Sequence, residues 1–122
     1  MTTLATPNAY KESAVLSAPP EMLVVMLYDG ARKFLFQAGV AMRDGQIELT
    51  NRKLHRAEDI IQHLRDSLDF EQRPIAQNLE AIYVFCLRQL RDARFKRDPK
   101  VLEHVSSLLG QLREAFAAIS PK

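Results

Sequence analysis

Cysteine, glycine and long apolar runs are scarce in this 122-residue sequence. The single cysteine, Cys86, excludes an intrachain disulfide and fits a reducing compartment. The longest apolar run, Met22 to Tyr28, is far shorter than the roughly 20 residues of a membrane-spanning helix. The first residues lack the basic start and apolar stretch of a secretory signal. We therefore expect a cytosolic protein without direct membrane insertion.

A strong excess of either charge is also absent. The chain has 17 basic and 15 acidic residues and a formal net charge of +2, so we expect no nucleic-acid partner. One basic cluster occurs, on Arg88, Arg91, Arg94, Lys96 and Arg97. Positive charge is favourable at the C-terminal end of a helix. We interpret the cluster in that way, with binding of phosphate or an acidic protein as the alternative.

The apolar spacing predicts helices and no strands. Residues recur at three, four and seven positions over about 19–43, 46–69, 74–96 and 99–119. Ser17, Pro74 and Asp98-Pro99 have the chemistry of helix starts, and Asp44-Gly45 that of a helix stop. The short polar turns predict an all-α, antiparallel four-helix bundle over 17–122, preceded by an N-terminal arm over 1–16.

The first predicted helix has more apolar residues than a peripheral helix can bury. Leu23, Leu27 and Phe34 share one face, whereas Val25 and Phe36 point nearly the opposite way. Smaller surpluses fall off the core stripes of the next two helices, at Leu49, Ile60, Val84 and Phe95. Contiguous apolar patches mark interaction sites, so we expect grooves that accept an amphipathic helix. The arm or a second copy of the chain could cover the same surface.

Candidate catalytic groups do not form a site. His55 and His63 are eight residues apart, which does not suit two metal ligands on one helix, and we expect both to be solvated. Cys86 falls on an apolar stripe and is expected to be a small buried side chain. Gly30, inside a helix, predicts close packing against another backbone. We expect no enzyme, no metal and no cofactor.

The residue order also resembles a known family. The string Ser-Ala-Pro-Pro-Glu-Met-Leu-Val-Val-Met-Leu-Tyr-Asp-Gly-Ala at 17–31 resembles the signature of the flagellar secretion chaperone family FliS. Further matches follow in order at Lys33-Phe34-Leu35, 57–61, 67–69 and 75–79, and then at Tyr83, Arg88 and Leu90. The resemblance covers nearly the whole chain. Three places depart from the family pattern, namely Gln72-Arg73-Pro74, Val84 and Phe116.

The resemblance implies a cytosolic chaperone that binds the disordered C-terminal segment of flagellin. It further implies that binding prevents premature polymerisation and that the chaperone delivers flagellin to the export-gate component FlhA. Tyr10 matches a tyrosine that the family links to groove covering and gate docking. The candidate groove residues are Tyr10, Val25, Tyr28, Asp29, Phe36, Leu49, Ile60, Tyr83, Val84 and Leu87. We expect a monomer or homodimer without the client, and a self-associating helical module is the alternative function.

Overall fold

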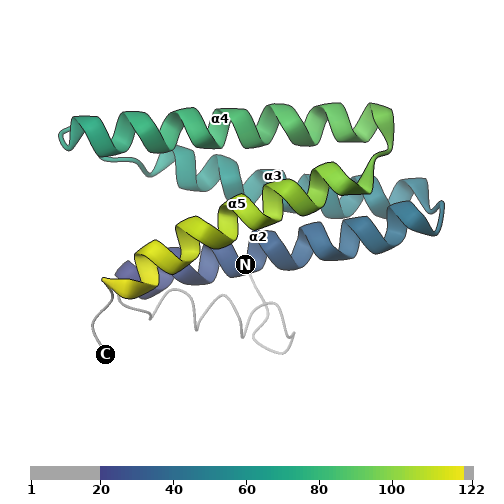
Figure 1. The fold of residues 1–122 in the computed structure, drawn as a ribbon, viewed down its shortest axis with the longest axis horizontal. Helices are drawn as coiled ribbons and strands as arrows, with labels where there is room; N and C mark the ends of the chain where they lie inside the picture. The colour runs from purple at the N-terminus through teal and green to yellow at the C-terminus, as the bar shows by residue number, and fades with distance from the viewer. Residues whose placement is uncertain (1–19, 120–122) are drawn as a thin grey trace, which may run out of the picture.

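The structure is a computed structural model that describes residues 20–119, and this part of the chain forms four helices (Figure 1). They are α2 (Pro20–Arg43), α3 (Ile47–Asp66), α4 (Arg73–Lys96) and α5 (Pro99–Ala118). The predicted all-α helical bundle is confirmed. The predicted arm, the Ser17 cap and Tyr10 lie outside the described residues.

Each helix packs against two neighbours. The chain runs up and down, so that α2 lies beside α3 and α5, and α4 completes the bundle between α3 and α5 (Figure 1). α5 crosses obliquely from the end of α4 towards the start of α2, and it packs more extensively on α2 than on α4. Because α2 has two close neighbours, much of its surface lies against other helices.

Local chemistry sets the helix ends. Gly45 adopts a φ of +74° after α2, and Gln46 N donates to Ala41 O at 2.9 Å, as in a glycine-terminated helix. At the start of α5, the Asp98 side chain accepts a hydrogen bond from Lys100 N at 3.0 Å. Both features agree with the signals in the sequence. α3 ends at Asp66, earlier than the expected 69, and the Ser67 hydroxyl donates to His63 O at 2.8 Å.

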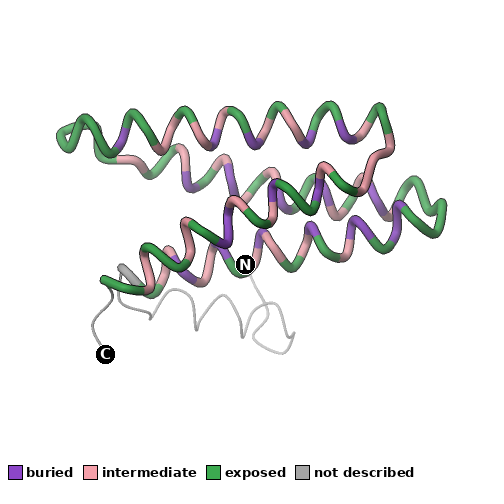
Figure 2. The backbone as a smooth tube through the Cα atoms, in the orientation of Figure 1, coloured by how far each residue is buried: buried purple, intermediate pink, exposed green. Residues whose placement is uncertain are grey.

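The core follows one stripe on each helix (Figure 2). The core side chains of α3, α4 and α5 fall at the predicted helical spacing, and Cys86 lies among them without solvent exposure. Ile47, Ile75 and Ile119, which we also expected on these stripes, lie near helix ends and are more than half exposed. The sequence singles out no core face on α2, and the structure divides its apolar residues: Val25 is buried, whereas Leu23, Leu27 and Phe34 are only half-buried. The buried stripe of α2 is Tyr28, Ala31, Leu35, Ala38 and Met42. Its small alanines let α3 and α5 approach closely.

A hydrogen bond between Tyr28 and Tyr83 joins diagonally opposite helices. Their hydroxyls meet in the core, and the rings lie 6.5 Å apart between centroids. Burial raises the pKa of both phenols, and the shared hydrogen bond raises that of Tyr28 further. Neither hydroxyl has another partner among the described residues. The pair is therefore a polar contact inside an otherwise apolar core.

Gly30 packs closely against a side chain of α3, that of Ile60, rather than against another backbone. A Cβ added at Gly30 would lie 3.4 Å from the Ile60 Cδ1 atom of α3. The expected close approach is present, although its partner is not the one predicted. Among residues 20–119, no helix is both long enough and apolar enough to cross a bilayer.

Candidate functional site

An apolar ridge runs along the outer side of α2. Phe36 is 73% exposed and Val40, one turn later, is 43% exposed. Exposed large apolar side chains that lie together mark places where proteins associate. Phe36 borders a groove on the side of α5 and a hollow on the side of α3. The ridge and its two flanks form the candidate protein-binding site.

The groove on the side of α5 has a volume of about 550 Å³. We call it the α2–α5 groove. Its lining residues recur at three and four positions along both helices: Arg32, Leu35, Phe36, Gly39 and Arg43 on α2, and Pro99, Leu102, Glu103, Ser106, Ser107, Gly110, Gln111 and Glu114 on α5. Gly39 and Gly110 are buried against the side chains of Arg43 and Arg32, whereas Phe36 and Ser107 are exposed at the groove. A groove between two helices with lining residues at helical spacing suits helix-in-groove recognition.

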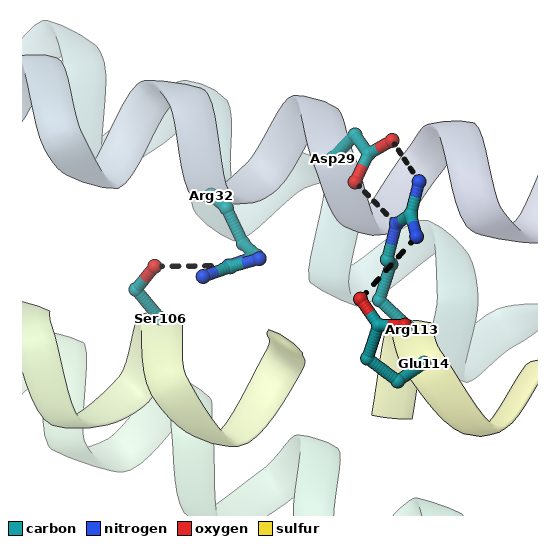
Figure 3. Close-up of polar contacts among 5 residues, drawn as sticks. All are labelled: Asp29, Arg32, Ser106, Arg113 and Glu114. Carbon is teal, nitrogen blue, oxygen red and sulfur yellow. Dashed lines mark hydrogen bonds and ion pairs between the residues drawn. The ribbon is translucent and has the colours of Figure 1, made fainter. Parts of the chain in front are cut away.

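Arg32 lies within this groove (Figure 3). Its Nε donates to Ser106 Oγ at 3.3 Å, and its guanidinium carbon is 2.9 Å from the place where a Cβ of Gly110 would stand. Any larger residue at position 110 would clash with the Arg32 guanidinium, so Gly110 is needed for the observed position of Arg32. Among residues 22–119, whose side chains the structure describes, no carboxylate pairs with Arg32. The guanidinium keeps donors that a bound molecule could use.

Other arginines along α2 and α5 do have carboxylate partners. Arg113 binds Asp29 through two hydrogen bonds, Nε–Oδ1 at 2.9 Å and Nη2–Oδ2 at 3.4 Å, and it also contacts Glu114 at 3.3 Å (Figure 3). The hydrogen bond with Asp29 raises the pKa of Arg113. Arg43 pairs with Glu103 across the same two helices. Asp29 therefore ties α2 to α5, whereas Arg32 is left without an ion pair in the described part of the chain.

The hollow on the other flank of the ridge lies towards α3 and has a volume of about 400 Å³. We call it the α2–α3 hollow. Phe36, Val40 and the half-buried Leu49 give it an apolar lining. The Oε1 atom of Gln37, which also lines it, is buried without a hydrogen-bond partner within the described chain. An occupant with a donor group could satisfy that atom.

Two further hollows lie between α3 and α4 and have more charged rims. Val84 lines one of about 450 Å³, where Arg65 and Glu80 form an ion pair at 3.4 Å. Leu87 lines the other, of about 330 Å³, where Arg94 and Glu58 pair at 3.1 Å. Arg94, part of the basic cluster noted in the sequence, is therefore engaged by α3.

Comparison with known proteins identifies the chain. The family model described as "Flagellar protein FliS" matches residues 3–122. The flagellar secretion chaperone FliS of Salmonella typhimurium is 38% identical over 113 residues, covering 91% of this chain and 84% of the relative. The corresponding protein of Vibrio cholerae is 35% identical over 120 residues, covering 94% and 88%. That of Bacillus subtilis is 32% identical over 109 residues, covering 89% and 81%.

The chain belongs to the FliS family. The resemblance seen in the sequence is thereby confirmed, and with it an assignment to flagellar secretion chaperones, which are not a family of enzymes. Among the described residues, no His, Cys, Asp and Glu side chains gather in a group that could hold a metal ion. Burial raises the pKa of the Cys86 thiol to about 11.

The structure separates the residues that we expected in one FliS groove. Val25, Tyr28 and Tyr83 are buried in the core, so the expectation that they line an open groove is corrected. Their apolar and aromatic surface is used by the bundle itself. Ile60 is half-buried and packs against the core. Asp29 forms an ion pair with Arg113, so its carboxylate already has a partner within the chain.

Only some of the expected residues lie together. Phe36 and Leu49 share the α2–α3 hollow, whereas Val84 and Leu87 line separate hollows between α3 and α4. The sequence reasoning missed Arg32 and the α2–α5 groove. The available signal was Gly110, a glycine inside the apolar pattern of the last helix and close to two serines.

Proposed function

We propose that this chain is a cytosolic export chaperone that binds the C-terminal segment of flagellin. Its membership of the FliS family is the observation that carries this proposal. The exposed ridge of Phe36 and Val40 supports it, because a chaperone for a helical segment needs apolar surface that its own core does not use.

The proposed mechanism is competition for one apolar stripe. The C-terminal segment of flagellin forms coiled coils in the filament through an apolar stripe. While flagellin is in the cytosol, the segment uses that stripe to bind the chaperone instead. Full burial of a phenylalanine side chain is worth about 1.5–3 kcal/mol, so burying the exposed part of Phe36 contributes about 1–2 kcal/mol. Ordering the segment costs about 2–5 kcal/mol of the gross contact energy. Several apolar contacts along the grooves are therefore required for a stable complex.

Calorimetric titration tests client binding. The purified chain is titrated with a synthetic flagellin C-terminal segment and, as the control, with an N-terminal flagellin segment of equal length. We expect one-to-one binding of the C-terminal segment alone. Absence of binding of that segment at tens of micromolar rejects the proposal.

Delivery to the export gate is the second part of the proposal. We infer that the loaded chaperone docks on the cytosolic domain of FlhA and that Tyr10 contributes to docking. A pull-down with that domain, using the chain with and without the flagellin segment, measures this step. We expect retention of the loaded complex and its loss in Tyr10→Ala, and retention of the variant at the wild-type level contradicts the role of Tyr10.

Self-association is the alternative function. The 73% exposure of Phe36 favours it, because a second copy could cover the ridge. A homodimer that does not dissociate when flagellin is added would support a structural module. A dimer that gives way to a one-to-one complex would support the chaperone.

A further inference from the structure

We propose that a helix of the client binds in the α2–α5 groove and that Arg32 forms an ion pair with a carboxylate of this helix. The inference rests on the proposed function and names one contact within it. The occupant is an amphipathic helix that lays its apolar face against Phe36 and presents one Asp or Glu to Arg32.

The charges around Arg32 favour an acidic occupant. Arg32 lies between two ion pairs at the edges of the groove, Arg43–Glu103 and Arg113–Glu114. The carboxylates of those pairs are already engaged by other arginines. Arg32 has only the neutral hydroxyl of Ser106 as its partner among the described residues. A guanidinium has a planar set of donors that matches a carboxylate, so the complementary group on an occupant is acidic.

A glycine on α5 admits Arg32 to the groove. A methyl group at position 110 would stand 2.9 Å from the Arg32 guanidinium carbon, and hence α5 makes room for this arginine by having a glycine there. The guanidinium fills the space beside the buried Gly110, and Ser107, which also lines the groove, is exposed. An occupant of the groove therefore meets the guanidinium at this position rather than the backbone of α5.

The α2–α5 groove has the length of a short helix. The lining of the groove runs along α5 from Pro99 to Glu114. At 1.5 Å per residue this distance is about 22 Å, which equals about four turns of helix. Leu35 and Leu102 line the groove but are almost fully buried, so Phe36 is its largest exposed apolar side chain. A groove of this length and composition fits a short amphipathic helix.

A charge reversal with rescue tests the proposal. Titrations compare the wild-type chain, Arg32→Glu and the control Arg52→Glu, which places the same charge change on an exposed residue of α3 outside the groove. We expect Arg32→Glu to weaken binding of the flagellin C-terminal segment about 10- to 100-fold, as for loss of a charge-assisted hydrogen bond. Segments in which each Asp or Glu is replaced in turn by Lys are then tested, and one of them should restore binding to Arg32→Glu.

The outcomes separate this inference from the function. If the wild type binds the segment and Arg32→Glu binds it equally well, or if no Lys-containing segment restores binding, the carboxylate contact is refuted and the chaperone function stands. If the wild type does not bind, the function and this inference fail together.

A labelling experiment keeps the test valid if Arg32→Glu folds poorly. Cys86 is fully buried, so a cysteine introduced on the surface is the reactive thiol of the folded protein. Ser107→Cys lies in the groove, and His104→Cys lies on an exposed part of the same helix outside it. We expect the flagellin segment to slow labelling at position 107 and not at 104. Equal rates at position 107 with and without the segment overturn the placement in the groove.

Discussion

The hydroxyl pair of Tyr28 and Tyr83 makes a quantitative prediction about stability. Both phenols are buried, and each is the other's hydrogen-bond partner in the described core. Tyr28→Phe removes one hydroxyl and leaves the other buried without a partner, which costs about 1–3 kcal/mol. Tyr83→Phe does the same from the opposite helix. Each single variant should therefore lose that amount of unfolding free energy.

The double variant should behave differently. Tyr28→Phe with Tyr83→Phe removes both polar groups and leaves two rings of nearly unchanged shape, so we expect a loss of only about 0–1 kcal/mol. The coupling energy is the double change minus the sum of the single changes. With about 2 kcal/mol for each single variant and about 0.5 kcal/mol for the double variant, it should amount to about 3.5 kcal/mol in favour of the double variant.

Urea unfolding followed by circular dichroism measures all four proteins. The comparison is valid if the slope of free energy against urea stays constant across the set. If the double variant loses as much unfolding free energy as the two single variants together, or more, the two hydroxyls do not form a coupled buried pair and the prediction is refuted.

Three further predictions concern single sites. Phe36→Ala should weaken binding of the flagellin segment about tenfold, from the loss of about 1–2 kcal/mol of burial, with little change in urea stability. Phe95→Ala, which removes an 81% exposed ring on α4, is the matched control in the same titration, and equal weakening by both variants would count against the ridge. Asp98→Ala should cost about 1 kcal/mol in urea unfolding, because the first turn of α5 loses its side-chain cap, and an unchanged midpoint would contradict that role. Burial raises the pKa of Cys86 from 9.0 to about 11, so its contribution to stability is complete below pH 9 and is lost as pH rises towards 11. In Cys86→Ala the unfolding free energy should decrease less between pH 9 and 10 than it does in the wild type. An identical decrease in both proteins would exclude ionisation of the Cys86 thiol as its cause.

The sequence specifies most of the bundle through local signals. Asp98-Pro99, Pro74 and Gly45 act within one turn of the residues that they cap or stop, so their effect is visible in the sequence. The central parts of the apolar stripes of α3, α4 and α5 also lie in the core, because each of these helices buries one main face, whereas Ile47, Ile75 and Ile119 near the helix ends are exposed.

The core face of α2 could not be read from hydrophobicity. This helix packs against both α3 and α5, and the residues at the centre of its buried stripe include Ala31 and Ala38. Alanine adds little to an apolar pattern, yet it allows the closest approach of a neighbouring helix. The pattern of α2 is apolar almost all round, so it does not single out this stripe, and Leu23, Leu27 and Phe34 are only half-buried.

The binding surface depends on contacts between residues far apart in the chain. Whether an arginine is paired is decided by its neighbours in space, as with Arg113, which finds Asp29 on another helix. Arg32 finds only Ser106, and nothing local in the sequence distinguishes the two arginines. Tyr28 and Tyr83 share this property, because only the assembled bundle brings their hydroxyls together.

Light scattering coupled to size-exclusion chromatography tests the central claim most directly. The claim is that the bundle has an apolar surface that accepts a helix from another protein. The chain, of 13.9 kDa, is run alone and with an excess of the flagellin C-terminal segment. We predict a single complex whose mass equals one chain plus one segment. A mass that stays at that of the chain alone or of its homodimer, with no segment in the peak, would contradict the account.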